Sequence, residues 1–189
     1  MTRLLAPLAV LLALPLAACD ADESLLGEFE ARIDIDQAPR FVDGEAVYTV
    51  VDGPQGPEFV LGLFVGDLFE SDFDRYDYVL FRRPGVRPGV GAYAVDDDPV
   101  SAVAATIANV DGADDPLRAT GEVLRGVTGT LALTRVDDYG FAAGTFHFDA
   151  TGFDVGAPSR SVSGRASGTF EARYEPPAAF RRLGLDLGI

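Results

Sequence analysis

The sequence contains no lysine and no tryptophan, and its 189 residues include one cysteine, one histidine and one methionine. A single cysteine has no partner for an internal disulfide, and the histidine and cysteine counts exclude a metal site built on several such ligands. All 15 basic residues are therefore arginines, and they are outnumbered by 30 acidic residues, so that the formal net charge is −15. A surface this acidic repels phosphate backbones and anionic lipid headgroups, so nucleic-acid binding is disfavoured.

The N-terminus carries the pattern of a secretory signal. Arg3 precedes an apolar run over residues 4–16, and the small residues Ala17 and Ala18 follow it. The run is too short to span a bilayer stably, and a charged start with small residues at the far end is typical of a segment that is cleaved off.

The tetrapeptide Leu16-Ala17-Ala18-Cys19 closes this run, and it resembles the lipobox of bacterial lipoproteins. The resemblance implies that the signal is cut before Cys19, that the thiol is linked to diacylglycerol and that the new amino group is acylated. Two or more acyl chains anchor a protein stably, whereas one alone anchors it only marginally. We therefore predict a membrane-bound protein of the cell envelope that faces the periplasm or the exterior. The alternative is an ordinary signal peptide with a chance cysteine.

These features divide the chain into four parts. They are a signal peptide (residues 1–18), a lipidated tether (19–27), an all-β domain (28–175) and a C-terminal tail (176–189). The tail is expected to be either a short helix docked by Phe180 and Leu183 or a frayed end.

The segment over residues 161–174 is the clearest strand. Apolar and small residues occupy every second position from Val162 to Tyr174, and polar residues occupy most of the others. This two-residue period predicts a strand with one buried and one solvated face, and Phe170 is expected in the core. The phrase Gly168-Thr169-Phe170 recurs as Gly144-Thr145-Phe146 and loosely as Gly129-Thr130-Leu131, which indicates neighbouring strands of one antiparallel sheet.

Most of the remaining chain has the same character. Residues 37–44 are expected to form a connection, and the Ala-rich segment 100–110 fits helix as well as strand, although its context favours strand. About nine or ten short strands predict an all-β fold, either a single antiparallel β-sandwich or a closed β-barrel. The other expected strands cover residues 28–36, 45–51, 58–65, 76–81, 89–95, 117–127, 128–136 and 141–150.

A looser resemblance covers much of the domain. Tyr76-x-Tyr78, Pro88-Gly89 with Tyr93, the Gly-Thr hairpin and the final Gly-Thr-Phe with Tyr174 look like features of small uncharacterised all-β lipoproteins of environmental bacteria. This resemblance implies no activity and no site residues.

His147 is the candidate general base, and paired carboxylates for glycoside hydrolysis are a further, minor possibility. His147 shares a strand face with Asp149 at two-residue spacing, which could orient an imidazole as a general base. No Gly-x-Ser-x-Gly motif supplies a nucleophile, and the single cysteine is assigned to lipid. We therefore predict a histidine on a solvated strand face, with a hydrolase that uses His147 as an alternative.

Acidic turns are the one candidate for metal binding. Carboxylate oxygens suit Ca²⁺, but the spacing matches no EF-hand, so solvated turns are the main interpretation and a calcium site is the alternative. The acidic candidates are Asp72, Asp74, Asp77, Asp96, Asp97, Asp98, Asp111, Asp114 and Asp115. The aromatic residues Phe69, Phe73, Tyr76 and Tyr78 are expected either to line a groove or to plug one end of a barrel.

The leading hypothesis for function is a lipid-anchored cell-envelope β-domain with a structural or binding role and without catalysis. Its partner is the membrane, through the lipid on Cys19, and no cofactor other than calcium is considered. Gly164, Ala166 and Gly168 on the inward face suggest an alternative, a calyx-like carrier of a small apolar ligand. An interior filled by large side chains would argue against that carrier.

Overall fold

The computed structural model describes residues 27–53, 55–65, 75–96, 102–112, 118–137, 140–177 and 180. No helix in this part of the chain is long and apolar enough to cross a membrane. The strands are β1 (Gly27–Ile35), β2 (Ala38–Gly53), β3 (Gly56–Val65), β4 (Arg75–Pro84), β5 (Gly91–Val95), β6 (Ala104–Asp111), β7 (Thr120–Val136), β8 (Phe141–Asp154) and β9 (Ser161–Tyr174).

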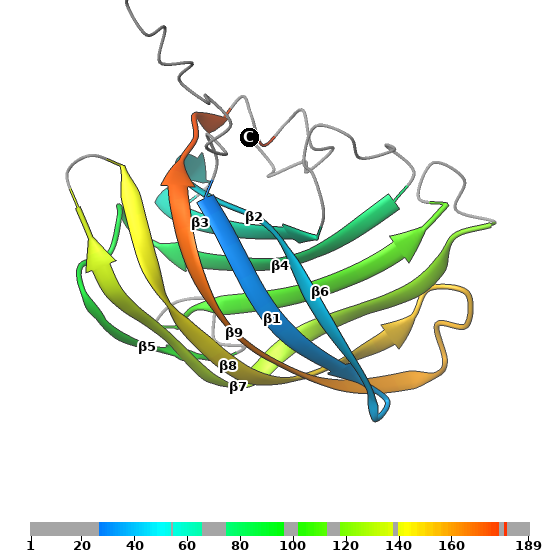
Figure 1. The fold of residues 1–189 in the computed structure, drawn as a ribbon. Coiled ribbons are helices and arrows are strands. Elements are labelled where there is room, and N and C mark those ends of the chain that lie inside the picture. The colour runs from blue at the N-terminus through cyan, green and yellow to red at the C-terminus, as the bar shows by residue number, and fades with distance from the viewer. Residues whose placement is uncertain are drawn as a thin grey trace, which may run out of the picture.

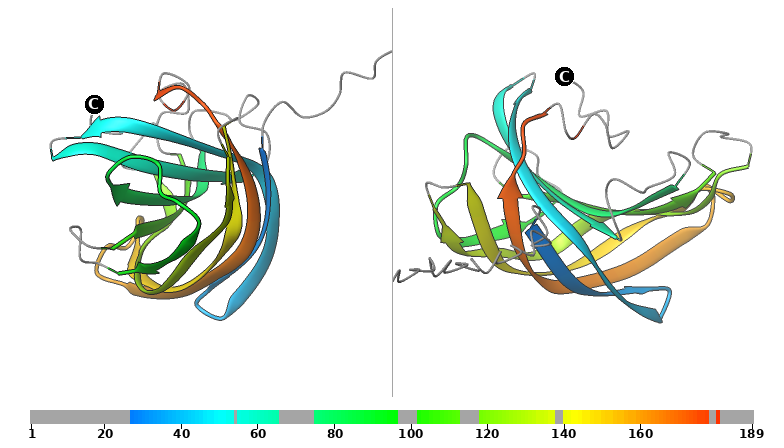
Figure 2. Two further views of the ribbon diagram at one scale, coloured as in Figure 1. Left: turned by 90° about the vertical axis from the view of Figure 1, so that its left-hand side faces the viewer. Right: turned by 45° about the horizontal axis from the view of Figure 1, so that its top comes forward.

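Eight of these strands close into an antiparallel barrel, which confirms the all-β prediction and selects the barrel over the sandwich. The order is β7-β6-β4-β3-β2-β1-β9-β8, and β8 pairs with β7 to complete the circle. The strands curve around a common interior (Figure 1 and the left view of Figure 2). β5 is the additional strand. β6 pairs with residues 120–125 of β7 and β5 pairs with residues 129–133, so β6 and β5 lie one after the other along the same edge of β7.

The predicted connection over residues 37–44 is wrong, because β2 already begins at Ala38. Asp36 and Gln37 have φ values of 49° and 68°, and two consecutive positive values are the mark of a two-residue hairpin turn of type I′. The Ile35–Ala38 pair closes this turn, so the next pair, Asp34–Pro39, is one that exchanges no hydrogen bonds. Pro39 therefore fits the strand although it lacks an N–H group.

A second correction concerns the strands expected over residues 117–127 and 128–136, because residues 120–136 form the single strand β7. β7 runs without interruption opposite β8, and the pairing register shifts between Gly126 and Thr128. Such a shift bends a strand without ending it. The predicted strand over residues 100–110 is confirmed in type, although β6 begins only at Ala104.

The barrel interior is filled by side chains from all around the circle. Phe81 of β4 is fully buried, and its ring centroid lies 5.3 Å from that of Phe146 and 5.7 Å from that of Phe148, both on β8. Phe170 is 5% exposed and belongs to the same core, as predicted. A Cβ atom on Gly168 would lie 2.9 Å from Cζ of Phe146, so this glycine makes room for an aromatic ring.

A second, smaller apolar cluster lies outside the barrel, on β2, β3 and β4. It explains why the middle of β2 and β3 is buried on both faces. Phe180 of the C-terminal tail is fully buried in it and has helical conformation, as the docked-tail prediction requires, whereas Leu183 lies outside the described residues. The cluster consists of Val47, Val51, Val60, Phe64, Leu80 and Phe180, with Tyr78 packed against it.

Because neighbouring barrel strands are antiparallel, the turns alternate between two ends. What we call the N-terminal end holds the start of β1, the turn between β2 and β3, the loop over residues 85–90, the turn between β7 and β8, and the end of β9. It lies toward the upper left in Figure 1. The opposite end holds the turn between β1 and β2 and the loop between β8 and β9.

Candidate functional site

A groove of about 1090 Å³ lies on the outer surface over β1, the first half of β2, and β9. Strand alternation points every second side chain of these strands away from the core and into the groove. The outward-facing residues are Glu28, Glu30 and Arg32 of β1, Phe41, Asp43 and Glu45 of β2, and Ser167, Thr169 and Glu171 of β9.

One end of this groove is strongly acidic. The strand register places Glu28 directly between Glu45 and Glu171, and it places Glu30 beside Asp43. Like charges directly opposite one another destabilise a sheet, by an amount on the order of 1 kcal/mol or less per pair. Arg135 approaches Glu171 to 3.6 Å from outside the groove. The arrangement therefore attracts cationic groups.

The other end of the groove is aromatic. Phe41 is 78% exposed, and the guanidinium carbon of Arg32 lies 5.8 Å from the centroid of its ring. Arg32 also donates two hydrogen bonds to the carboxylate of Asp34, at 3.2 and 3.3 Å. An exposed ring beside a row of carboxylates can take a partner that carries both apolar and cationic groups.

The sequence does not predict this groove, because residues 37–44 resemble a connection and Phe41 then has no place on a strand face. Glu28 and Glu30 lie on the solvated face of the first strand, as expected, but Glu45, Asp43 and Glu171 reach them only through the strand pairing.

His147 lies exposed on the outer face of β8, as predicted. Asp149 accepts a hydrogen bond of 2.7 Å from Nε of Arg165, and this bond, together with the charge of Asp149, raises the pKa of the Arg165 guanidinium above its ordinary value. Among the residues that the structure describes, His147 has no hydrogen-bond partner that would orient its ring. The geometry gives no support to a His147–Asp149 base.

The acidic candidates for calcium are only partly covered by the structure. Asp77 receives two hydrogen bonds of 2.8 Å from the guanidinium of Arg40, so its carboxylate is held by a cation. Val95 stands opposite Gly129 and Asp111 opposite Thr120, so roughly 25–30 Å of strand separates Asp96 from Asp111. The described ranges contain no group of three or more His, Cys, Asp or Glu residues that could hold a metal. Asp72, Asp74, Asp97, Asp98, Asp114 and Asp115 lie outside them.

Of the four aromatic residues expected to line a groove or plug the barrel, only Tyr78 has a side chain that the structure describes, and it does neither. The ring centroid of Tyr78 lies 6.1 Å from that of Phe64, on the outer cluster rather than at an end of the barrel. Phe69 and Phe73 lie outside the described residues, as does the side chain of Tyr76.

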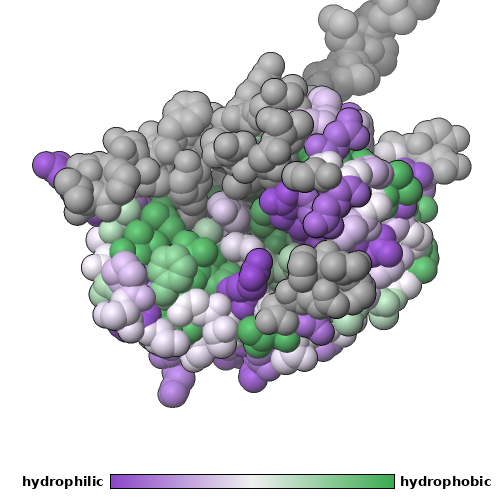
Figure 3. All heavy atoms as spheres, turned by 180° about the vertical axis from the view of Figure 1, so that it is seen from behind, coloured by the Kyte–Doolittle hydropathy of each residue, from purple (hydrophilic) through white to green (hydrophobic). Residues whose placement is uncertain are grey.

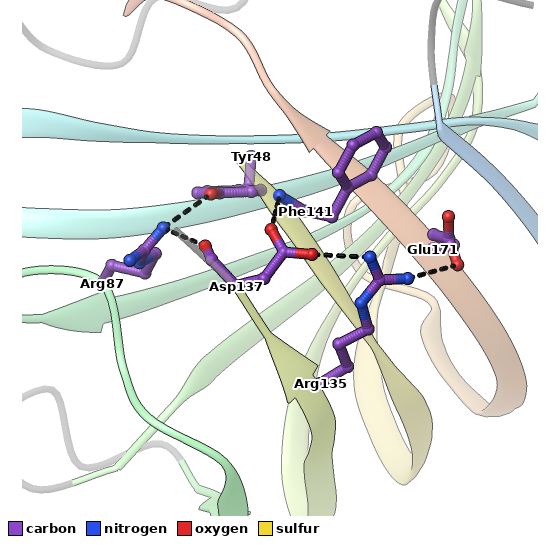
Figure 4. A network of polar contacts seen from close by, with 6 residues as sticks. All are labelled: Tyr48, Arg87, Arg135, Asp137, Phe141 and Glu171. Carbon is purple, nitrogen blue, oxygen red and sulfur yellow. Dashed lines mark hydrogen bonds and ion pairs between the residues drawn. The ribbon is translucent and has the colours of Figure 1, made fainter. Parts of the chain in front are cut away.

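A polar network closes the N-terminal end of the barrel (Figure 4). Arg87 donates to the backbone oxygen of Asp137 at 2.6 Å and contacts the hydroxyl of the buried Tyr48 at 3.5 Å. The carboxylate of Asp137 accepts from Arg135 at 2.6 Å and from the backbone N–H of Phe141 at 3.0 Å. The network ties the loop over residues 85–90 to β2 and to the end of β7, and it joins β7 to β9, so it fixes this end of the barrel.

The chain is thus an antiparallel β-barrel with a filled interior and a groove on its outer surface. Comparison with known proteins found no family model, no curated protein and no solved structure that matches it. Cys19 and residues 1–18 lie outside the described part of the chain.

Proposed function

We propose that the chain is a lipid-anchored β-barrel domain of the cell envelope, with a binding or structural role on its outer surface and without catalysis. The observation that carries this proposal is the tetrapeptide Leu16-Ala17-Ala18-Cys19 at the end of an apolar run. Only seven residues separate Cys19 from the first residue of β1, Gly27. A lipid on Cys19 would therefore hold the barrel close to the membrane.

The filled interior favours a role for the outer surface over the calyx-like carrier. Phe146 and Phe148 are each 2% exposed and meet Phe81 across the barrel, where a carried ligand would have to lie. A binding site for a small apolar molecule needs a cavity of several hundred Å³ lined by apolar groups. The core side chains occupy that space.

The groove over β1, β2 and β9 is the surface that we assign to binding. Glu28, Glu30 and Asp43 form no ion pair within the described residues, and Phe41 is exposed although it is large and apolar. The cost of placing these carboxylates side by side is offset when a cationic partner occupies the groove. The class of partner that fits is a basic, partly apolar segment of another envelope component.

The anchor is tested by comparing the full chain with its Cys19→Ala variant in a bacterial host. We expect the wild-type protein in the membrane fraction, with residues 1–18 removed and the mass of an acylated diacylglyceryl-cysteine at position 19. The variant should lose that mass and leave the membrane. Recovery of the wild-type protein in the cytosol with residues 1–18 attached would contradict the proposal.

The binding role is tested by crosslinking in intact cells, with Phe41→Ser and the double variant Glu28→Gln/Glu30→Gln compared with Phe153→Ser. Phe153 is 43% exposed on β8, outside the groove, and is therefore a matched control. We expect crosslinked species that both groove variants lose and the control keeps. Equal loss, or no loss, in all three variants would remove the groove from the proposal.

A further inference from the structure

In the loop over residues 85–90, apolar side chains are exposed to solvent while a charged side chain is partly buried. Val86 and Val90 are each 65% exposed, whereas the charged Arg87 between them is half-buried and Pro88 is buried. In water the opposite arrangement is favoured, because valine gains by burial and arginine by hydration.

The loop is fixed in this arrangement by hydrogen bonds from three directions. The backbone N–H of Gly85 donates to the oxygen of Pro57 at 2.7 Å, and the hydroxyl of Tyr93 donates to the oxygen of Gly89 at 2.7 Å. Arg87 reaches into the barrel end to the oxygen of Asp137, as Figure 4 shows. These bonds hold the loop backbone, so the valine side chains stay on the outside.

The loop lies at the N-terminal end of the barrel, where β1 begins. Gly27 begins β1 beside Ala172 of β9, and Tyr174, two residues further along β9, is 45% exposed at the same end. The eight steps from Cys19 to Gly27 span at most about 29 Å when fully extended. Phe153 stands opposite Ser161, the first residue of β9, and so lies about 36 Å from this end of the barrel, near the other end.

We propose that residues 85–90 rest on the surface of the phospholipid bilayer, with Val86 and Val90 at the boundary between headgroups and acyl chains. This inference depends on the lipid anchor proposed above. Two valines bind a membrane too weakly on their own, but a short tether turns the contact into an intramolecular one with a high effective concentration. The lipid therefore supplies the attachment, and the loop sets the orientation of the barrel.

The charge near the loop is compatible with this contact, although the protein as a whole is acidic. Arg83 stands just before the loop, and its guanidinium lies 4.9 Å from the ring centroid of Tyr93 and donates to the oxygen of Pro84. Within the described ranges it forms no ion pair with a carboxylate. Its charge remains available to lipid phosphates, as is common for arginines at a membrane interface.

The absence of tryptophan makes a direct test possible, because each introduced indole is the only one in the chain. The full-length lipidated variants V86W, V90W and F153W are purified and placed in phosphatidylethanolamine vesicles that contain phosphatidylcholine brominated on its acyl chains. Bromine quenches only indoles at the membrane. We expect the emission of V86W and V90W to fall severalfold relative to unbrominated vesicles, and that of F153W to stay unchanged.

The two proposals fail in different ways in this experiment. If bromine quenches V86W no more than F153W in protein that carries the lipid, the loop contact is overturned and the anchor is left intact. If the protein purified from the membrane fraction carries no lipid on Cys19, the anchor and the loop contact that depends on it are both overturned. A second variant adds Val90→Asp to V86W, and we expect it to recover most of the emission while its melting temperature stays unchanged, because position 90 is exposed. Undiminished quenching in this variant would also contradict the inference.

Discussion

Replacing Phe81 with alanine tests whether the barrel interior is a packed core. Phe81 is fully buried on β4, and its ring meets the rings of Phe146 and Phe148 across the barrel at 5.3 and 5.7 Å, both edge to face. Truncation of a buried Phe to Ala costs about 3–5 kcal/mol. Each lost aromatic contact is worth about 0.5–1.5 kcal/mol beyond the buried area, which places Phe81→Ala in the upper half of that range.

The assay is denaturant unfolding of the detergent-solubilised protein, followed by circular dichroism because the chain has no tryptophan. We expect the free energy of unfolding to fall by about 4–5 kcal/mol in Phe81→Ala, and by clearly less in Phe81→Leu, which keeps more of the volume. The alanine variant should also gain a dry cavity, so benzene should raise its melting temperature and leave that of the wild type unchanged.

Two results would refute this reasoning. A loss below 1 kcal/mol in Phe81→Ala would show that the ring does not lie in a packed core. Stabilisation of the wild type by small apolar molecules would show that the interior has room for them, and the calyx-like carrier would then become the better account.

Three further predictions concern the barrel wall. Phe170→Ala should cost about 3–5 kcal/mol of unfolding free energy, whereas Glu171→Ala on the outward face should change it by about 0.5 kcal/mol or less; equal effects would mean that the faces of β9 are assigned wrongly. Gly168→Ala should cost about 1–3 kcal/mol because its Cβ would meet the backbone oxygen of Glu30 and the ring of Phe146, whereas Gly89→Ala, with nothing within 4 Å, should be nearly neutral; the thermal midpoints of the two variants measure the difference. Arg40→Met should lower the free energy of unfolding by about 3–5 kcal/mol, because it removes a cation from Asp77, whose side chain is 6% exposed. The double variant Arg40→Met/Asp77→Asn should recover part of that loss, and an additive double-mutant cycle would contradict the pairing.

The sequence predicts β8, β9 and the second half of β7 well because each has one face in the core and one in water. On β8 and β9 the alternation is unbroken, and the Gly-Thr-Phe phrases correctly indicate neighbours: Thr145 stands opposite Thr169, and Leu131 opposite Phe146. The first half of β2 is missed because Pro39 and Gly44 resemble turn residues. Pro39 is tolerated only through its place in the ladder, which is a property of the hairpin and not of the local composition.

Closure of the sheet and the groove depend on pairings between distant segments. A sandwich and a barrel have the same strands, and only the pairing of β8 with both β7 and β9 distinguishes them. Likewise, Glu28 and Glu171 become neighbours only when β9 returns beside β1. Asp77 shows the converse error: the acidic segment around it suggests a solvated turn, yet its side chain is nearly buried and paired with Arg40, more than thirty positions away in the sequence.

The central claim is that a lipid on Cys19 holds this barrel at a membrane, and mass spectrometry of the N-terminal peptide from cell membranes tests it most directly. We predict a peptide that begins at Cys19 and carries a diacylglyceryl thioether with an acylated amino group. An unmodified cysteine, or a peptide that still contains residues 1–18, would contradict the account.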